Sequence, residues 1–339
     1  MSLQAADRPL NELHDAMLLD LDGVVYIGPA AVPAAPEAVG KARAAGARVA
    51  FVTNNAGRTP ARIAEHLTQL GVPATPEDVV TSAEAAARLV SSRFPAGSEV
   101  LVVGDTGLRQ AVRRMGLRPV TVASDEVVAV VQGYSRSMSR DLLDQGTLAV
   151  SRGALYVASN SDATAPTEWG VTPANGSFVR VIAHATGVEP IVAGKPQRPL
   201  HEEGMLRTGA SNPLIVGDRL DTDIEGATVH GAAGLLVLSG VATARDALAA
   251  PLHQRPRYLA WNVSGMNEAH PGPVRRVDGD TARTECGGWT VTASRGAVRI
   301  SGSGDRLDGL RALCAAVWAD ETIDPAGTSS TEALAALGW

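Results

Sequence analysis

Two carboxylates, Asp20 and Asp22, follow the apolar residues 17–19 with a single residue between them. Burial of one unpaired carboxylate is costly, and a second one nearby adds electrostatic repulsion. A chain that ends a buried strand in this way needs a positive partner for the pair, or it uses the pair in catalysis. Side chains two residues apart in a strand project to the same side, so both carboxylates can face one cleft.

Four segments place polar residues directly after an apolar run. They are Asp20-Leu21-Asp22, Thr53-Asn54-Asn55, Gly194-Lys195-Pro196, and Gly217-Asp218 followed by Asp221 and Asp223. Ligands of open parallel sheets bind beyond the carboxyl ends of the strands, so we expect these segments to share one site. Three or more converging carboxylates need a divalent cation, and an all-oxygen ligand set favours Mg²⁺ over zinc.

These residue types suit the chemistry of a phosphate ester. Lys195 supplies a compact positive charge, and the Thr53 hydroxyl near a helix start can donate to phosphate oxygens. A carboxylate that Mg²⁺ and a lysine keep ionised can attack phosphorus and form an aspartyl-phosphate. The second aspartate can protonate the leaving oxygen and later accept a proton from water, a division typical of two carboxylates with separated pKa values.

Alternating strands and helices must position these residues. In the first part of the chain we predict a strand that ends at Asp20, a helix over 35–45, a strand over 47–55 and a helix over 60–70. Thr59 is the expected N-cap of that last helix, and Pro60 suits its first position. Apolar strands that alternate with capped helices predict an α/β fold with a Rossmann-like parallel sheet.

The same alternation repeats between the second and third polar segments. Predicted strands lie at 99–105, 126–133 and 154–160, and predicted helices at 106–115 and 139–150. We therefore predict a core of residues 13–82 and 187–262, interrupted by an inserted α/β domain of residues 83–186.

The residue pattern of the chain changes after residue 261. Residues 264–273 resemble a linker, residues 287–304 alternate like an antiparallel hairpin, and 308–319 and 331–337 have helical patterns. Residues 270–339 are thus predicted to form a small α+β appendix, in which we find no residues suited to catalysis.

Composition restricts the expected partners and cellular location of the protein. The formal net charge of −6 argues against a nucleic-acid partner, which normally meets a basic stripe. Cys286 and Cys314 fit no metal-binding spacing, so we expect small apolar fillers in a reduced, cytoplasmic setting. The N-terminal segment lacks the pattern of a signal peptide, and no apolar run approaches the length of a membrane span.

The segments "DLDGVVY", "FVTNN", "AGKP" and "VGDRLDTDI" resemble, in order, the four motifs of the haloacid dehalogenase superfamily. Their form is similar to the p-nitrophenylphosphatase and NagD-like branch, which carries a large C2-type cap between the second and third motifs. The resemblance covers about residues 13–261. It implies a Rossmann-like core, a C2 cap at the predicted insertion, and a Mg²⁺-dependent phosphomonoester hydrolase.

The resemblance also implies a role for each matching residue. Asp20 is the implied nucleophile and Asp22 the implied acid/base. The implied Mg²⁺ ligands are the Asp20 carboxylate, the Asp22 backbone carbonyl and Asp218, with Asp223 supporting the waters of the metal. The residues implied for phosphate or substrate are Thr53, Asn54, Asn55, Lys195 and, from the cap segment "ASNSDATAPTEWGVTPANGS", Asn160 and Asp162.

The branch acts on small phosphorylated metabolites. One actinobacterial member with a comparable appendix hydrolyses glycerol 3-phosphate, which makes this the leading substrate and glycerophospholipid metabolism the expected context. Phosphoglycolate, nucleotides or a broad range of metabolites stay open, because Ser135 stands where the cap often has an aspartate. Tyr134 and Trp169 can line the cleft or pack within the cap. Caps of this branch often contribute to dimers, which implies a homodimer.

Two other functions stay open. A mutase would pass the phosphoryl group to a sugar instead of water, and a sensor would use the appendix for regulation. Other interpretations of the motifs fit less well, because "GKP" lacks the remainder of a Walker A loop and "GDRLDTDIEG" lacks the length of an EF-hand loop. Four polar strand ends in order around an inserted domain favour the phosphatase.

Overall fold

A computed structural model describes residues 3–167 and 170–339, so Trp169 lies outside the described residues. The described chain forms two units. The first comprises 3–49, 70–72 and 210–339, and the second comprises 50–69 and 73–209. Residues 50–69 contain the second polar segment, and they belong to the same unit as the inserted segment.

Four parallel strands form the centre of the first unit, in the order β15-β14-β13-β1. Their bounds are β1 (Ala16–Leu19), β13 (Pro213–Gly217), β14 (Ala233–Val237) and β15 (Tyr258–Ala260). Every residue of these strands is buried, as is typical of parallel strands covered on both faces. Leu19 is in register with Val216, so the carboxyl ends of β1 and β13 lie at the same edge.

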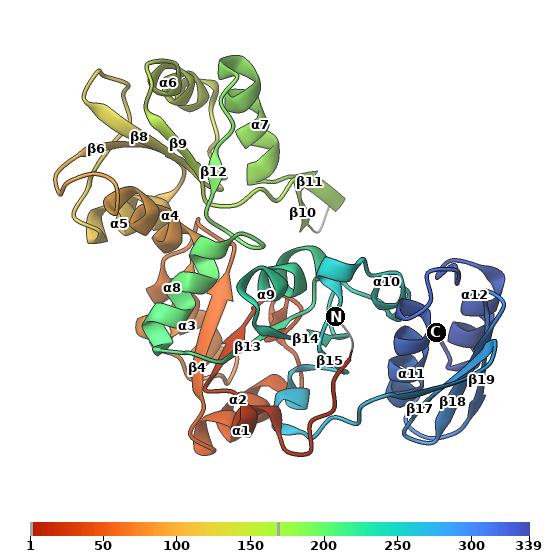
Figure 1. The fold of residues 1–339 in the computed structure, drawn as a ribbon. Helices are drawn as coiled ribbons and strands as arrows, with labels where there is room; N and C mark the ends of the chain where they lie inside the picture. The colour runs from red at the N-terminus through yellow and green to blue at the C-terminus, as the bar shows by residue number, and fades with distance from the viewer. Residues whose placement is uncertain (1–2, 168–169) are drawn as a thin grey trace. The chain divides into compact units, whose positions relative to one another are not determined.

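This part of the first unit also contains four helices, labelled in Figure 1, and one hairpin. They are α1 (Leu10–Leu13), α2 (Ala35–Ala44), α9 (Glu225–His230), α10 (Ala244–Leu248), and the strands β2 (Tyr26–Ile27) and β3 (Ala30–Ala31). The predicted helix at 35–45 is confirmed, and Gly46 follows it with a φ of +89°, a conformation that favours glycine.

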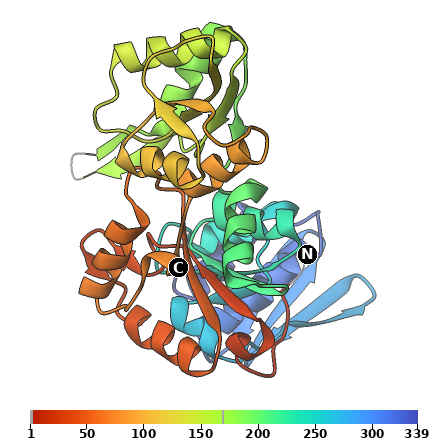
Figure 2. The ribbon, with the colours of Figure 1, turned by 90° about the vertical axis from the view of Figure 1, so that its left-hand side faces the viewer.

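The C-terminal appendix is an antiparallel sheet covered by two helices, seen from two sides in Figures 1 and 2. The strand order is β16-β17-β18-β19. The bounds are β16 (Val274–Asp278), β17 (Thr281–Cys286), β18 (Trp289–Ser294), β19 (Ala297–Gly302), α11 (Arg306–Trp318) and α12 (Thr328–Ala336). The predicted hairpin and both helices are confirmed. The sequence prediction omitted β16 and β17. Every residue of β16 is exposed, and the buried positions of β17 are the small residues Ala282, Thr284 and Cys286, so neither strand has a strong apolar pattern.

The interpretation of residues 264–273 as a linker is wrong. Val263–Asn267 form a 3₁₀ helix, η4, in which Met266 is fully buried. His270 is also buried, and its Nε2 lies 2.8 Å from the Gly265 carbonyl oxygen while its Nδ1 lies 3.4 Å from the Arg311 guanidinium. The glycine and proline residues of this segment indicate turns, and whether such turns are buried depends on the elements that pack against them.

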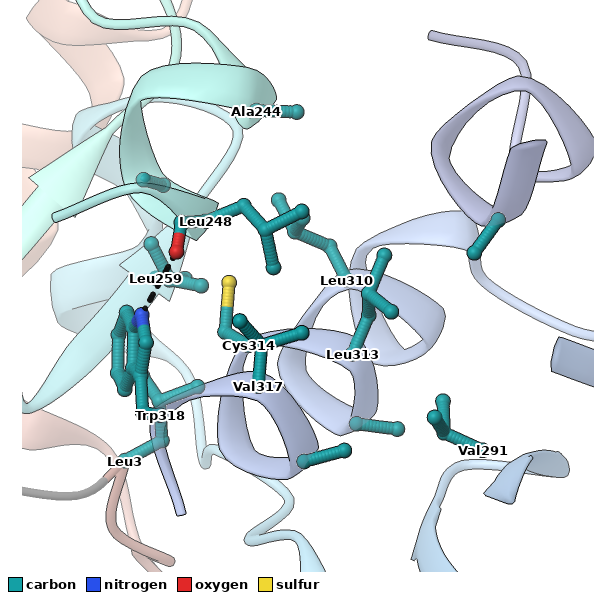
Figure 3. Close-up of a cluster of buried hydrophobic side chains, with 14 of the residues drawn as sticks. Leu3, Ala244, Leu248, Leu259, Val291, Leu310, Leu313, Cys314, Val317 and Trp318 are labelled. Carbon is teal, nitrogen blue, oxygen red and sulfur yellow. Dashed lines mark hydrogen bonds between the residues drawn. The ribbon is translucent and has the colours of Figure 1, made fainter. Parts of the chain in front are cut away.

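One hydrophobic core joins the appendix to the parallel sheet (Figure 3). Leu248 and Leu259 contribute from the side of the parallel sheet, and Leu313 and Cys314 contribute from α11. The Trp318 indole donates to the Leu248 carbonyl oxygen at 3.1 Å. Both cysteines are free and buried, which confirms their role as apolar fillers.

The second unit contains a five-stranded parallel sheet in the order β12-β9-β8-β6-β7. Its strands are β6 (Glu99–Val103), β7 (Arg118–Val120), β8 (Val127–Gln132), β9 (Leu155–Ala158) and β12 (Ile191–Val192). Helices α4 (Ser82–Ser91) and α5 (Thr106–Arg114) lie on one side, and α6 (Arg140–Ser151) and α7 (Asn175–Thr186) on the other (Figures 1 and 2).

The remaining elements of the second unit lie before or after the second and third polar segments in the chain. They are β4 (Arg48–Thr53), β5 (Val79–Thr81), α3 (Pro60–Gln69), α8 (Arg198–Thr208), the short helix η1 (Pro76–Asp78) and the hairpin β10 (Thr164–Thr167) and β11 (Gly170–Pro173). Thr59 accepts a hydrogen bond from the Arg62 amide at 3.4 Å, as expected for the N-cap of α3. The predicted α/β class with parallel sheets, an α/β insertion and an α+β appendix is confirmed.

Candidate active site

Three aspartates converge at the carboxyl edge of the parallel sheet in the first unit. Asp20 follows β1, Asp218 follows β13, and Asp223 lies in the π-helical turn Leu220–Ile224. One carboxylate oxygen of each lies within 4.8 Å of the other two. Asp218 and Asp223 are each only 1% exposed. We call Asp20, Asp218 and Asp223 the carboxylate cluster.

The local chain fixes the geometry of the carboxylate cluster. The Asp20 amide donates to the Val216 carbonyl oxygen at 2.9 Å, which extends the pairing of β1 with β13 past the strand ends. Asp218 Oδ2 accepts a hydrogen bond from the Val241 amide at 2.7 Å. Asp223 Oδ2 accepts one from the Arg219 amide at 3.2 Å. These bonds fix the backbone of Asp20 and orient the carboxylates of Asp218 and Asp223.

Glycines allow the backbone to approach the carboxylate cluster. A Cβ atom on Gly23 or Gly240 would collide with the Asp218 carboxylate, and one on Gly217 would collide with the Asp223 side chain. Gly23 also has a φ of +81°. No side chain other than hydrogen fits at these positions, so glycine is required there for steric reasons.

The carboxylate cluster fits a hard divalent cation. Three carboxylates so close together, two of them buried, repel one another unless a positive charge lies between them. The donors are oxygens, without histidine or cysteine, and this donor set suits Mg²⁺. Asp20 and Asp218 were predicted as direct ligands and Asp223 as a more distant one, and the structure brings all three together.

Two other aspartates of these segments lie differently. Asp22 is exposed in the turn after β1, where its backbone forms a bridge with Tyr26. Asp221 forms an ion pair with Arg219 at 2.7 Å, and hydrogen bonding from that guanidinium lowers the pKa of Asp221. Asp221 therefore belongs to a surface ion pair and stands apart from the carboxylate cluster.

In the second unit, Asn54 connects the second and third polar segments. Its Oδ1 accepts a hydrogen bond from the Lys195 amide at 2.8 Å, and its Nδ2 donates to the Lys195 carbonyl oxygen at 3.3 Å. Lys195 is 3% exposed, and its Nζ donates to the Val52 carbonyl oxygen at 3.3 Å. The structure thus brings Lys195 to the end of β4, next to Thr53.

The predicted cap residues join the same group. Asn160 Nδ2 donates to the Asn54 carbonyl oxygen at 2.8 Å, and Asn54 Nδ2 lies 3.4 Å from Asp162 Oδ2. Asn175, at the start of α7, donates from Nδ2 to the Asn160 carbonyl oxygen at 2.8 Å. We call Asn54, Asn160, Asp162, Asn175 and Lys195 the amide network.

Asn175 was not among the predicted site residues. The sequence signal was present, because Asn175 lies in the same cap segment, "ASNSDATAPTEWGVTPANGS", that supplied Asn160 and Asp162. Thr53 Oγ1 accepts a hydrogen bond from the Asn55 amide at 3.1 Å. Asn55 itself is exposed, and its Oδ1 accepts from the Gly57 amide at 2.9 Å, so it organises its own turn.

Comparison with known proteins agrees with this arrangement. A family model described as haloacid dehalogenase-like hydrolase matches residues 17–118, and a second, HAD-hydrolase-like model matches residues 192–265. The D-glycerol 3-phosphate phosphatase of Mycobacterium tuberculosis is 40% identical over 326 residues, covering 92% of this chain and 88% of that protein. This chain belongs to the haloacid dehalogenase-like hydrolases. The predicted family and the prediction of a hydrolytic enzyme are confirmed.

Other haloacid dehalogenase-like relatives are phosphatases by name. A magnesium complex of glycerol phosphate phosphatase from Mycobacterium tuberculosis superposes with a TM-score of 0.87 at 38% identity, covering 98% of this chain and 99% of that one. A p-nitrophenyl phosphatase from Archaeoglobus fulgidus has a TM-score of 0.70 at 28% identity, covering 75% and 98%. The magnesium complex and the carboxylate cluster both agree with the predicted Mg²⁺ cofactor.

The appendix has a separate resemblance. A model described as GCN5-related N-acetyltransferase like domain matches residues 286–339. Phosphate groups often bind where a glycine-rich loop leads into a helix, as Gly302 and Gly304 lead into α11. Here Asp305 caps α11 by accepting from the Leu307 amide at 2.9 Å, and the Gly287 carbonyl oxygen would lie 2.7 Å from a Cβ on Gly304. The Asp305 carboxylate thus occupies the start of α11, where a phosphate group would bind. We therefore propose no acetyltransferase activity for the appendix.

Among the described residues, no helix is both long and apolar enough to cross a membrane.

Proposed function

We propose that this protein is a Mg²⁺-dependent phosphomonoester hydrolase that works through an aspartyl-phosphate on Asp20. The observation that carries the proposal is the convergence of Asp20, Asp218 and Asp223 within 4.8 Å at the ends of parallel strands. Asp20 and Asp218 would hold the ion directly, together with the Asp22 backbone carbonyl, and Asp223 would support its waters. The ion would offset the charge of the phosphoryl oxygens and of the converging carboxylates.

The chain's own residues would perform two steps. In the first, the Asp20 carboxylate attacks phosphorus, the ester P–O bond breaks, and Asp22 gives its proton to the leaving alkoxide. In the second, Asp22 accepts a proton from water as the water oxygen attacks phosphorus, which releases phosphate and restores the Asp20 carboxylate. Thr53 and Lys195 would bind the phosphoryl oxygens. The resemblance of the four segments, in order, to the motifs of the haloacid dehalogenase superfamily supports these roles.

We propose glycerol 3-phosphate as the substrate. The relative named D-glycerol 3-phosphate phosphatase aligns over 92% of this chain, a share that must include more than half of the appendix. The 5'-nucleotidase of Bacillus subtilis, at 36% identity, aligns over 97% of its own length but only 73% of this chain. The acid sugar phosphatase of Staphylococcus aureus aligns over 69% of this chain, so both of these relatives leave the rest of this chain without a counterpart.

The test is phosphate release from a panel that contains glycerol 3-phosphate, phosphoglycolate, nucleoside monophosphates and p-nitrophenyl phosphate, with Mg²⁺ and with EDTA. We expect Asp20→Asn to lower turnover on every ester by a factor on the order of 10³ or more, with an unchanged circular dichroism spectrum. Asp221→Asn is the matched control, because Asp221 lies in the same loop as Asp223 but pairs with Arg219.

Each outcome has a distinct meaning. Full turnover in the Asp20→Asn variant would refute the aspartyl-phosphate mechanism. Rapid release led by another ester would keep the mechanism and replace glycerol 3-phosphate as the substrate. Transfer of phosphate to a second alcohol without release of inorganic phosphate would indicate a mutase instead.

A further inference from the structure

The amide of Asn160 is fully used inside the protein. Its Nδ2 donates to the Asn54 carbonyl oxygen at 2.8 Å, and its Oδ1 accepts from the Asp162 amide at 3.2 Å. Asn160 is only 4% exposed. A side chain that is buried and has both ends bonded to protein is a poor candidate for contact with a substrate, although this position was predicted to bind one.

The bonds of Asn160 lead directly to Lys195. The Asn54 side chain bonds both the amide and the carbonyl of Lys195, so one residue fixes both backbone groups of the lysine. Gly194 allows this close approach, because a Cβ atom there would lie 2.5 Å from Asn54 Oδ1 and 3.1 Å from Asn160 Cβ. A shift of Asn160 therefore moves Asn54 or the chain at Lys195.

The start of α7 also contacts Asn160. Asn175 is 1% exposed, and its Nδ2 donates to the Asn160 carbonyl oxygen at 2.8 Å. The next amide, of Gly176, donates to the Asp162 carbonyl oxygen at 2.8 Å. A Cβ atom on Gly176 would collide with the Ser161 carbonyl oxygen, so the helix start and this segment lie in direct backbone contact.

We propose that Asn160 and Asn175 are positioning residues that set the place of the Lys195 ammonium through Asn54, and that neither contacts the leaving group of the substrate. This inference rests on the proposed function, in which Lys195 binds the phosphoryl group. All phosphomonoesters share that group. A displaced Lys195 therefore slows the hydrolysis of every ester by a similar factor, whereas loss of a contact with the leaving group slows only some of them.

The kinetic test compares Asn175→Ala and Asn160→Ala with wild type on glycerol 3-phosphate and on p-nitrophenyl phosphate. We expect kcat/KM to fall on the order of 10–100-fold for both esters, with the ratio between the two esters kept within about twofold. The matched control is Gln145→Ala, because Gln145 is another cap amide but accepts from the Ala123 amide at 2.7 Å, away from the amide network. A fall confined to glycerol 3-phosphate, or no fall for either ester, would overturn the proposal.

A second measurement, the NMR resonance of the Lys195 side chain, does not depend on enzymatic turnover. Lys41 and Lys195 are the two lysines of the chain, and the Lys41 side chain is exposed. Selective ¹³C labelling of lysine therefore gives two Cε resonances, which Lys41→Arg assigns. We expect Asn175→Ala to shift the Lys195 resonance and to leave the Lys41 resonance unchanged in a protein that stays folded. An unmoved Lys195 resonance would refute the positioning role.

The two readouts separate this inference from the proposed function. If the wild-type protein hydrolyses no ester, the proposed function fails, and the Lys195 resonance still decides whether Asn175 positions the lysine. If wild type hydrolyses esters and Asn175→Ala changes neither the rate nor the resonance, only the positioning role fails.

Discussion

Leu313→Ala in α11 tests whether the appendix and the aspartate-bearing sheet unfold as one body. Leu313 is fully buried in the core that also contains Leu248 and Leu259 (Figure 3). The substitution removes three carbon groups, which at about 0.8 kcal/mol each corresponds to about 2.4 kcal/mol of lost hydrophobic transfer free energy. The cavity left behind raises the cost to about 3–4 kcal/mol, within the range of about 2–5 kcal/mol typical of buried leucines.

The assay is urea unfolding followed by tryptophan fluorescence, together with hydrogen exchange of β13 and β14. Four of the five tryptophans, Trp261, Trp289, Trp318 and Trp339, belong to the first unit, so fluorescence reports mainly on that unit. With a denaturant slope of about 2–3 kcal/mol per molar, we expect the unfolding midpoint to fall by about 1 M or more. Amides of β13 and β14 are expected to exchange faster by the same free energy.

The exposed Leu252 supplies the control, because Leu252→Ala should change stability by less than about 0.5 kcal/mol. Coupling between the appendix and the sheet would be refuted if Leu313→Ala lowered the midpoint of a separate transition while the exchange of β13 and β14 stayed at the wild-type rate. That result would mean that the appendix unfolds alone and that the shared core couples it only weakly to the sheet.

Three further predictions follow from the site and from the contacts of the appendix. Gly240→Ala should weaken Mg²⁺ binding on the order of 10–100-fold by displacing the Asp218 carboxylate, and isothermal calorimetry measures this; unchanged affinity would contradict the steric argument. Mg²⁺ should raise the thermal unfolding midpoint of wild type but leave that of Asp218→Asn almost unchanged, and equal shifts would exclude Asp218 as a ligand. Burial, with a smaller contribution from Arg311, lowers the pKa of His270, so the unfolded chain binds a proton first and stability falls as the pH drops below about 6.5. His270→Gln should reduce this slope in urea titrations between about pH 7.5 and 5.5, and an unchanged slope would assign the pH dependence to other groups such as His14, whose pKa burial also lowers.

The sequence alone determined the local elements and the types of residue that carry the chemistry. Alternating strands and capped helices predicted the α/β class, because hydrophobic period and capping are properties of short segments. Asp20, Asp218 and Lys195 were recognisable because each follows an apolar run, and the carboxyl ends of parallel strands meet at one edge. The resemblance to haloacid dehalogenase motifs added an order to these segments, and the comparisons confirmed that family.

The tertiary structure decided what depends on distant neighbours. It placed Asp223 in the carboxylate cluster and turned Asp221 toward Arg219, although both lie in one short acidic segment. It buried Met266 and His270 and placed the His270 ring 3.4 Å from the Arg311 guanidinium, which a turn-rich composition cannot indicate.

The bond between Asn54 and the Lys195 amide joins residues 141 positions apart, and that of Asn160 with Asn54 joins residues 106 apart. No local pattern contains such a pairing, because a side-chain amide can bond any backbone group that the fold brings within reach. Sequence therefore supplied the reacting groups, and packing supplied the residues that hold them in place.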